Sequence, residues 1–237
     1  MRTVGHHTST PNIECSEEQL VYSRCLRGSG SGPTLPLEPR RQPSVGGLHL
    51  VLGPMFSGKS TELQRLMRRH SLAGRRVLVV KHRRDLRYSD DEQALLTADG
   101  HAMAAVPVES LAELDDSVWH AAHVIGIDEG QFYDDLVSFV HRALDAGKLI
   151  VVAALDGTFE RKAFGAVLSL VPLADSVTKL LAVCSRCGAD APFTMRLGDE
   201  RETRLIGGAD KYMAVCRGCY ADSRINARLD IHSSATS

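Results

Sequence analysis

The sequence predicts an α/β protein with a parallel-sheet core and a small zinc-ribbon lobe near its C-terminus. Three observations predict this class: apolar segments alternate with helical patterns from Gly47 onward, a glycine-rich turn follows the first apolar segment, and two C-x-x-C pairs come late in the chain. The 237 residues are 43% hydrophobic, which suits one buried core with a small appendage.

Short apolar runs alternate with longer amphipathic ones. The runs that read as strands are Leu48–Leu52, Val77–Val80, Val124–Ile127 and Leu149–Ala154. Continuous apolar runs suit strands that are buried on both faces of a parallel sheet. The helical pattern favours helices over Thr61–Ala73, Leu111–Ala122 and Leu136–Ala146. This alternation predicts a doubly wound sheet.

The glycine-rich turn Gly53–Ser60 fits the pattern G-x-x-x-x-G-K-[ST]. Its backbone N–H groups would point at phosphate oxygens, and the following helix adds its positive N-terminal end. Lys59 is predicted to reach the β- and γ-phosphates, and Ser60 to offer its hydroxyl to Mg²⁺. Because the turn lies between a strand and a helix, it predicts the ATP site of a P-loop NTPase with a RecA-like core. The predicted ATP-binding residues here are Gly53, Pro54, Met55, Phe56, Ser57, Gly58, Lys59, Ser60 and Thr61.

Two carboxylates, Asp128 and Glu129, follow the apolar strand Val124–Ile127. In phosphate-loop enzymes an aspartate at such a strand end holds Mg²⁺, which makes Asp128 the candidate. Glu129 would lie at the carboxyl end of the sheet, where it can accept a proton from an attacking hydroxyl or water. The alternative is a solvated acidic loop, and the neighbouring phosphate loop favours the magnesium interpretation.

Four of the six cysteines form two pairs, Cys184/Cys187 and Cys216/Cys219, while Cys15 and Cys25 stand apart. Paired cysteines of this spacing indicate a four-thiolate zinc site, although the gap between the pairs is longer than the commonest one. Such a site is closed and therefore structural. The alternative is four ordinary buried thiols.

Composition divides the chain into four predicted parts. Residues 1–45 carry a Gly-Ser repeat and a Pro- and Arg-bearing stretch, and are predicted to be a disordered extension rather than a targeting peptide. An ATP-binding domain is predicted over 46–182, a zinc-binding lid over 183–223 and a flexible tail over 224–237. The net charge of −1 favours neither nucleic acid nor a membrane as partner. With no apolar leader, we expect a cytoplasmic protein.

Taken together, four segments resemble the cytosolic, zinc-containing (type II) thymidine kinases. They are Gly53–Leu63, Gly126–Phe132, Ala153–Phe159 and Ile206–Tyr212. The similarity extends from Gly47 to about Tyr220 and includes the spacing between the cysteine pairs. It implies a kinase that moves the γ-phosphate of ATP to the 5′-hydroxyl of thymidine or deoxyuridine in nucleotide salvage.

The resemblance also implies roles for single residues. Glu129 matches the catalytic base, Asp128 the magnesium-linked acid, and Asp85 and Arg87 a phosphate-side segment. Around the thymine it implies Met55, Phe132, Leu155, Phe159, Thr194 and Tyr212, together with hydrogen bonds from the backbone of Leu205, Ile206, Gly207 and Gly208. A homotetramer and feedback inhibition by thymidine triphosphate are implied as well.

Two other functions compete with a kinase. A polynucleotide-stimulated ATPase would share the phosphate loop and acidic strand end, but it predicts a basic surface, which the near-neutral charge disfavours. A non-enzymatic zinc-ribbon interaction module would leave the phosphate loop unexplained.

Overall fold

The computed structural model describes residues 46–84, 94–96, 100–198 and 207–222. Their main feature is a six-stranded sheet in the order β5-β2-β6-β7-β1-β8, with every neighbouring pair parallel. Its strands are β1 (Gly47–Gly53), β2 (Val77–His82), β5 (Val106–Val108), β6 (Val124–Ile127), β7 (Leu149–Leu155) and β8 (Ser176–Lys179). The predicted α/β class with a parallel core is confirmed.

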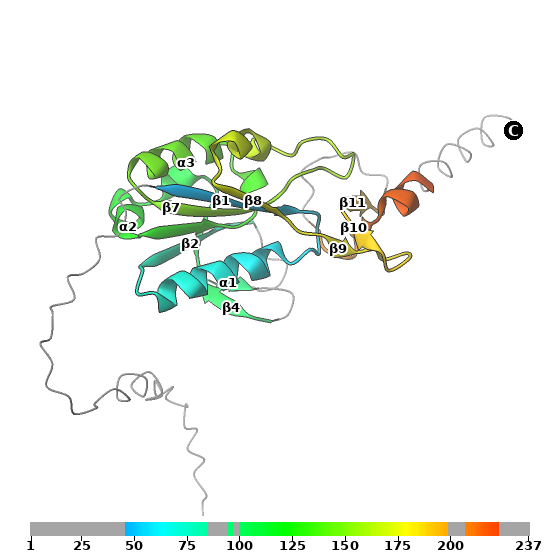
Figure 1. Ribbon diagram of the computed structural model, residues 1–237, viewed down its shortest axis with the longest axis horizontal. Coiled ribbons are helices and arrows are strands. Elements are labelled where there is room, and N and C mark those ends of the chain that lie inside the picture. The colour runs from blue at the N-terminus through cyan, green and yellow to red at the C-terminus, as the bar shows by residue number, and fades with distance from the viewer. Residues whose placement is uncertain (1–45, 85–93, 97–99, 199–206, 223–237) are drawn as a thin grey trace, which may run out of the picture. The chain divides into compact units, whose positions relative to one another are not determined.

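Helices cover both faces of this sheet. In Figure 1, α1 (Lys59–Leu72) lies on one face and α3 (Leu136–Asp145) on the opposite one. The central strand β7 shows why: Ile150 and Val152 pack in the apolar cluster that contains α3, while Val151 and Ala153 pack in the one that contains α1. Successive side chains of a strand point to opposite faces, so an apolar run buries both.

One predicted helix is wrong in its extent. The structure breaks Leu111–Ala122 into a 3₁₀ helix η2 (Leu111–Glu113) and the helix α2 (Asp116–Ala121). Ser110 and Glu113 form a capping box around η2, and the Asp115 carboxylate accepts the Ser117 N–H at the start of α2. Because each cap satisfies backbone N–H groups at a helix start, two starts replace one continuous helix.

The remaining elements are short. They are the hairpin β3 (Ala94–Leu96) and β4 (Ala102–Ala104), the 3₁₀ helices η3 (Gly130–Phe132) and η4 (Val167–Leu173), and the strands β9 (Ala182–Val183), β10 (Asp190–Ala191), β11 (Phe193–Arg196) and β12 (Tyr212–Val215). No helix among the described residues is long and apolar enough to cross a membrane.

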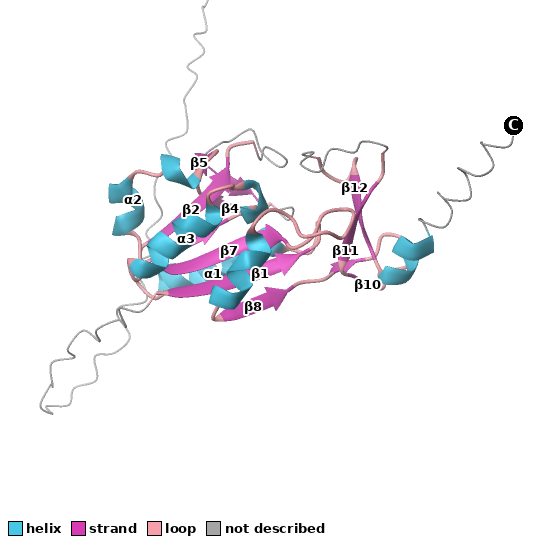
Figure 2. Ribbon diagram, turned by 90° about the horizontal axis from the view of Figure 1, so that it is seen from above, coloured by secondary structure: helices cyan, strands magenta, loops and turns pink. Residues whose placement is uncertain are grey.

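We use the name cysteine lobe for the described residues from β9 onward, 182–198 and 207–222, which include strands β9 to β12 and a helical turn over 217–222. These strands pair as two separate antiparallel ladders, β9 with β10 and β11 with β12, seen as short arrows in Figure 2. Among the described residues of the lobe, a small cluster is buried: Ala182, Cys184, Ala191, Ala214, Val215 and Tyr220, with the partly buried Phe193, Met195 and Met213 packed against it. A lobe with so little apolar volume needs a further source of stability.

Candidate active site

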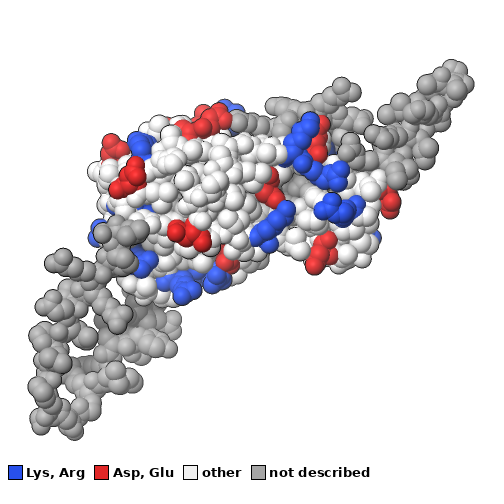
Figure 3. Space-filling model, turned by 45° about the horizontal axis from the view of Figure 1, so that its top comes forward, with Lys and Arg blue, Asp and Glu red and all other residues white. Residues whose placement is uncertain are grey.

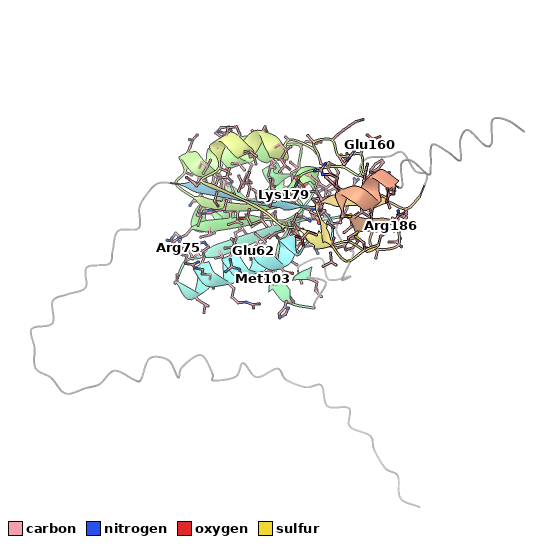
Figure 4. The ribbon with its side chains drawn as sticks, turned by 45° about the vertical axis from the view of Figure 1, so that its right-hand side comes forward. Glu62, Arg75, Met103, Glu160, Lys179 and Arg186 are labelled. Atoms are coloured by element: carbon pink, nitrogen blue, oxygen red, sulfur yellow. The ribbon has the colours of Figure 1, made fainter. Side chains whose placement is uncertain are left out.

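The phosphate loop connects the carboxyl end of β1 to the start of α1. Gly58 caps α1 in the left-handed conformation, with a φ of 79°. A Cβ atom on Gly53 would lie 2.6 Å from the Leu180 carbonyl oxygen, so only glycine fits against this neighbour. Strands β7 and β8 flank β1. Lys179 of β8, labelled in Figure 4, forms a 2.6 Å ion pair with Asp156, the residue that follows β7. The start of the loop is therefore closely packed against Leu180, next to strands whose ends are joined by this ion pair.

Lys59 is the buried cation of this loop. Its Nζ donates to the Pro54 carbonyl oxygen at 2.8 Å, and the Ser57 hydroxyl donates to the same oxygen at 2.9 Å. The ammonium group therefore lies over the loop that would hold phosphates. A charge in this position can stabilise the negative charge that develops on a transferring phosphoryl group.

Ser60 and Asp128 meet although they come from α1 and from the end of β6. The Ser60 hydroxyl lies 3.0 and 2.9 Å from the two Asp128 carboxylate oxygens. Asp128 is 2% exposed. A hydroxyl and a carboxylate supply the oxygen ligands that Mg²⁺ prefers, so this pair fits the predicted magnesium site.

Glu129 follows Asp128 and lies in the left-handed region, with φ 51° and ψ 43°. This conformation is uncommon for a residue other than glycine and is frequent at functional sites. The side chain is 5% exposed, and its Oε2 accepts a hydrogen bond from the Gln131 amide. A buried carboxylate at the sheet's carboxyl end can act as a proton acceptor.

Residues far apart in the sequence form an apolar cluster that includes side chains predicted to surround the base, and we call this cluster the pocket wall. Met55, Leu155, Phe164 and Tyr212 make one buried cluster, against which Phe132 packs. The Met55 N–H donates to the Thr194 hydroxyl at 2.9 Å, which joins the phosphate loop to β11. The Arg196 guanidinium lies 4.1 Å from the Phe159 ring centre and donates to the Tyr212 hydroxyl at 2.5 Å. The structure therefore brings together all the described side chains predicted to surround the base.

The four paired cysteines converge in the cysteine lobe. The Sγ atoms of Cys184, Cys187, Cys216 and Cys219 lie within 4.8 Å of one another, and those of Cys187 and Cys216 are 3.6 Å apart. A tetrahedral zinc ion with Zn–S bonds of about 2.3 Å needs sulfurs about 3.8 Å apart. Gly188, with a φ of 76°, turns the chain directly after the first pair. This donor set fits Zn²⁺.

The thiols influence each other's protonation. The Cys216 backbone N–H lowers the pKa of Cys184 to about 6, whereas the neighbouring Cys187 thiol raises the pKa of Cys219 to about 12. Four thiolates this close repel one another unless a cation lies between them, so the arrangement favours binding of a cation.

Comparison with known proteins gives the family. The family model for thymidine kinase matches residues 46–220. The chain belongs to the thymidine kinase family. It is 50% identical over 188 residues to a cytosolic thymidine kinase of Gallus gallus, covering 79% of this chain and 80% of that protein. It is 53% identical over 167 residues to the cytosolic thymidine kinase of Homo sapiens, covering 70% of each chain. A thymidine kinase of Myxoma virus (strain Lausanne) is 51% identical over 167 residues, 70% of this chain and 92% of the viral one.

Four residues predicted from the resemblance to thymidine kinases lie outside the described residues: Asp85, Arg87, Leu205 and Ile206. Gly207 and Gly208 lie within them, half-buried at the end of that segment. The Gly208 carbonyl accepts the Tyr212 N–H at 3.1 Å, and the Gly208 N–H donates to Asp210 at 2.9 Å. The glycine pair is thus tied to the start of β12, beside Tyr212 of the pocket.

Sequence reasoning missed three side chains that the structure places in this site: Phe164, Gln131 and Arg196. Each carried a signal. Phe164 and Gln131 lie in or next to segments matched to the thymidine kinase family, and Arg196 lies two residues after Thr194 on β11. Since residues two apart in a strand share a face, the Thr194 assignment also pointed to Arg196.

The cysteine lobe contacts the loop that carries Phe159. The Tyr220 hydroxyl donates to the Phe159 carbonyl at 2.8 Å. The Arg161 guanidinium lies 4.3 Å from the Tyr220 ring centre and 5.5 Å from that of Phe193. A structural change at the cysteines can therefore shift the loop that carries Phe159, because Tyr220 contacts both regions.

Proposed function

We propose that this chain phosphorylates the 5′-hydroxyl of thymidine, and of deoxyuridine, with ATP as donor, and so supplies the monophosphate for DNA synthesis. Membership of the thymidine kinase family supports the nucleoside kinase reaction. The observation that carries the proposal is the position of Met55. It belongs to the phosphate loop, yet its side chain packs in the apolar pocket wall and its N–H binds Thr194. A base in this pocket would have its sugar directed at the phosphate site.

In the proposed transfer, the nucleoside 5′-oxygen attacks the γ-phosphorus of ATP. A new P–O bond forms, the bond to the β,γ-bridging oxygen breaks, ADP leaves, and the hydroxyl proton passes to Glu129. Lys59 stabilises the charge on the phosphoryl oxygens. Ser60 and Asp128 would hold Mg²⁺, which would supply positive charge to balance that of the phosphates. Asp85 and Arg87 are proposed to contact the phosphates.

Base selection is proposed to come from backbone hydrogen bonds. The segment from Leu205 to Gly208 would read the O2, N3 and O4 edge of thymine. Cytosine has a donor in place of O4 and lacks the N3 proton, so buried backbone groups would be opposed, each at a cost of about 1–3 kcal/mol. Deoxyuridine lacks only a methyl group, worth about 1 kcal/mol in an apolar pocket, and should remain a substrate.

The predicted domain division gives each part a role in this proposal. We propose that an ATP-binding domain over 46–182 carries the chemistry and that a lid over 183–223 is held by one structural zinc ion. A lid that closes over the nucleoside would exclude water, which could otherwise accept the phosphate.

We also propose a homotetramer in the cytosol with feedback inhibition by thymidine triphosphate. The names of the animal relatives support the location. An edge of the sheet supports self-association. Strand β8 is an edge strand, shown in Figure 2, and exposed apolar side chains lie on it and on the preceding η4: Leu168, Val171, Leu173 and Val177. Exposed apolar groups at an unprotected strand edge favour contact between copies. Sizing the Val177→Lys variant tests this, with smaller particles expected.

A nucleoside panel tests the activity itself. Transfer of labelled γ-phosphate from ATP should be fast with thymidine and deoxyuridine, and far slower with deoxycytidine and deoxyguanosine. Comparable rates for deoxycytidine and thymidine would contradict the proposed base reading. The same assay with single-stranded DNA tests the rival ATPase. Acidic and basic side chains are interspersed on the face in Figure 3, so we expect no stimulation.

A further inference from the structure

We propose that Gln131 is a positioning residue that fixes the Glu129 carboxylate relative to the wall of the base pocket. This inference depends on the proposed role of Glu129 as the base. Gln131 is 1% exposed, and both ends of its amide make hydrogen bonds. The Oε1 atom accepts the Leu155 N–H at 2.9 Å, and the Nε2 atom donates to Glu129 Oε2.

The orientation of this amide follows from its partners. A backbone N–H can only donate, so the end of Gln131 that faces Leu155 must be the oxygen. The nitrogen then faces Glu129 and offers N–H donors to it, which suits an ionised carboxylate that accepts. The Gln131 amide therefore fixes the Glu129 carboxylate through its Oε2 atom.

Close backbone packing keeps Gln131 from moving. A Cβ atom on Gly130 would lie 2.7 Å from Val152 Cγ1, and one on Gly165 would lie 2.7 Å from the Gln131 carbonyl oxygen. Both neighbours thus approach within a distance that only glycine permits. The turn that carries Gln131 packs against β7 on one side and against the loop of Gly165 on the other.

The other end of the connection, Leu155, is part of the pocket. Its side chain packs with Met55, Phe164 and Tyr212. The path from base to pocket is thus a single side chain: Glu129 carboxylate, Gln131 amide, Leu155 backbone. A shift of about 1 Å in the relative position of reacting groups can cost about 100-fold in rate, so this path should act on kcat rather than on nucleoside affinity.

Two substitutions separate the two ends of the amide. Gln131→Met removes both hydrogen bonds and keeps a side chain of similar length. Gln131→Glu keeps an acceptor for the Leu155 N–H and replaces the amide donor to Glu129 with a second carboxyl group. We expect both variants to lower kcat by about 10-fold to 100-fold, with the thymidine Kd changed by less than about threefold.

A matched control and a double-mutant cycle exclude a merely structural role. Gln64 is 3% exposed and donates to the Leu95 carbonyl at 2.7 Å, so Gln64→Met removes a comparable buried hydrogen bond outside the site. It should lower the unfolding temperature yet keep kcat. In a Glu129→Gln background, Gln131→Met should have no further effect on kcat, because the group it positions is gone.

One set of measurements distinguishes the outcomes: the rate of phosphate transfer by each variant, including its single-turnover rate. A loss of kcat in both Gln131 variants that disappears in the Glu129→Gln background supports the inference. A kcat within threefold of wild type in both variants overturns it, and so does an equal loss in the two backgrounds or a loss confined to thymidine affinity. A Glu129→Gln enzyme with wild-type kcat would instead refute the proposed base.

Discussion

The parallel-sheet core and the cysteine lobe are stabilised in different ways. In the core, fully buried large side chains such as Phe139, Ile150 and Leu63 fill both faces of the sheet. Each buried side chain of this size contributes about 1.5–3 kcal/mol. The buried cluster of the lobe is smaller, with three alanines, Val215, Cys184 and Tyr220, and with Phe193, Met195 and Met213 only partly buried against it. We therefore expect the core to fold without metal and the lobe to depend on its four thiolates.

The core and the cysteine lobe are also expected to differ in their roles, in phosphate transfer and in binding of the base. The groups proposed for phosphate chemistry, Lys59, Ser60, Asp128 and Glu129, all belong to the core. The pocket proposed for the base is shared, since Met55 and Leu155 come from the core while Thr194 and Tyr212 come from the lobe. Damage to the core should therefore lower kcat, and damage to the lobe should mainly weaken thymidine binding.

The largest effects are expected from substitutions of Lys59 and Glu129 in the core. Lys59→Ala removes the charge that stabilises the transferring phosphoryl group, so kcat should fall by at least about 100-fold to 1,000-fold. Zinc content should not change. Steady-state kinetics and elemental analysis of the same preparation check both. A kcat within about threefold of wild type would contradict the assignment of residues 53–60 as the phosphate-binding loop.

A smaller effect is expected from breaking the metal site. Cys184→Ser should reduce bound zinc from one ion per chain to a small fraction and raise the thymidine KM by about 10-fold to 100-fold, as loss of groups that organise a metal site typically does. The unfolding transition of the core should persist. Cys15→Ser, outside the two pairs, is the control and should keep its zinc. Unchanged zinc in Cys184→Ser would contradict the site.

The smallest expected effect concerns the contact between the two regions. Tyr220→Phe removes the hydrogen bond to the Phe159 carbonyl and leaves the ring under Arg161. One such bond is worth about 1 kcal/mol, so the thymidine KM should rise by up to about fivefold at constant kcat. Should kcat fall and KM stay constant, Tyr220 would act on the chemistry and the division of tasks would be wrong.

Local patterns predicted the core better than the contacts between its parts. Strand Val124–Ile127 was predicted with the same bounds because an apolar run followed by acids is a short-range signal. Leu111–Ala122 was predicted as one helix because its apolar spacing outweighed the capping signals of Ser110 and Asp115. The edge strand β8 was missed because Ser176–Lys179 is exposed at every position and lacks a buried pattern.

Contacts between distant segments could not be read from spacing at all. Gln131 meets Leu155 because η3 packs against the end of β7, and Arg196 stacks on Phe159 across two regions. Each contact depends on the folded arrangement rather than on any local sequence preference. The resemblance to thymidine kinases named the residues around the base but did not show how they are connected.

The most direct test of the account measures single-turnover transfer of labelled γ-phosphate from ATP to thymidine by Glu129→Gln, alongside binding of both substrates. The substitution keeps the shape of the side chain and removes the proton acceptor. We predict transfer slower by about 100-fold to 10,000-fold, with both dissociation constants within about threefold of wild type. Transfer at the wild-type rate would contradict the assignment of the chemistry to the acidic end of β6.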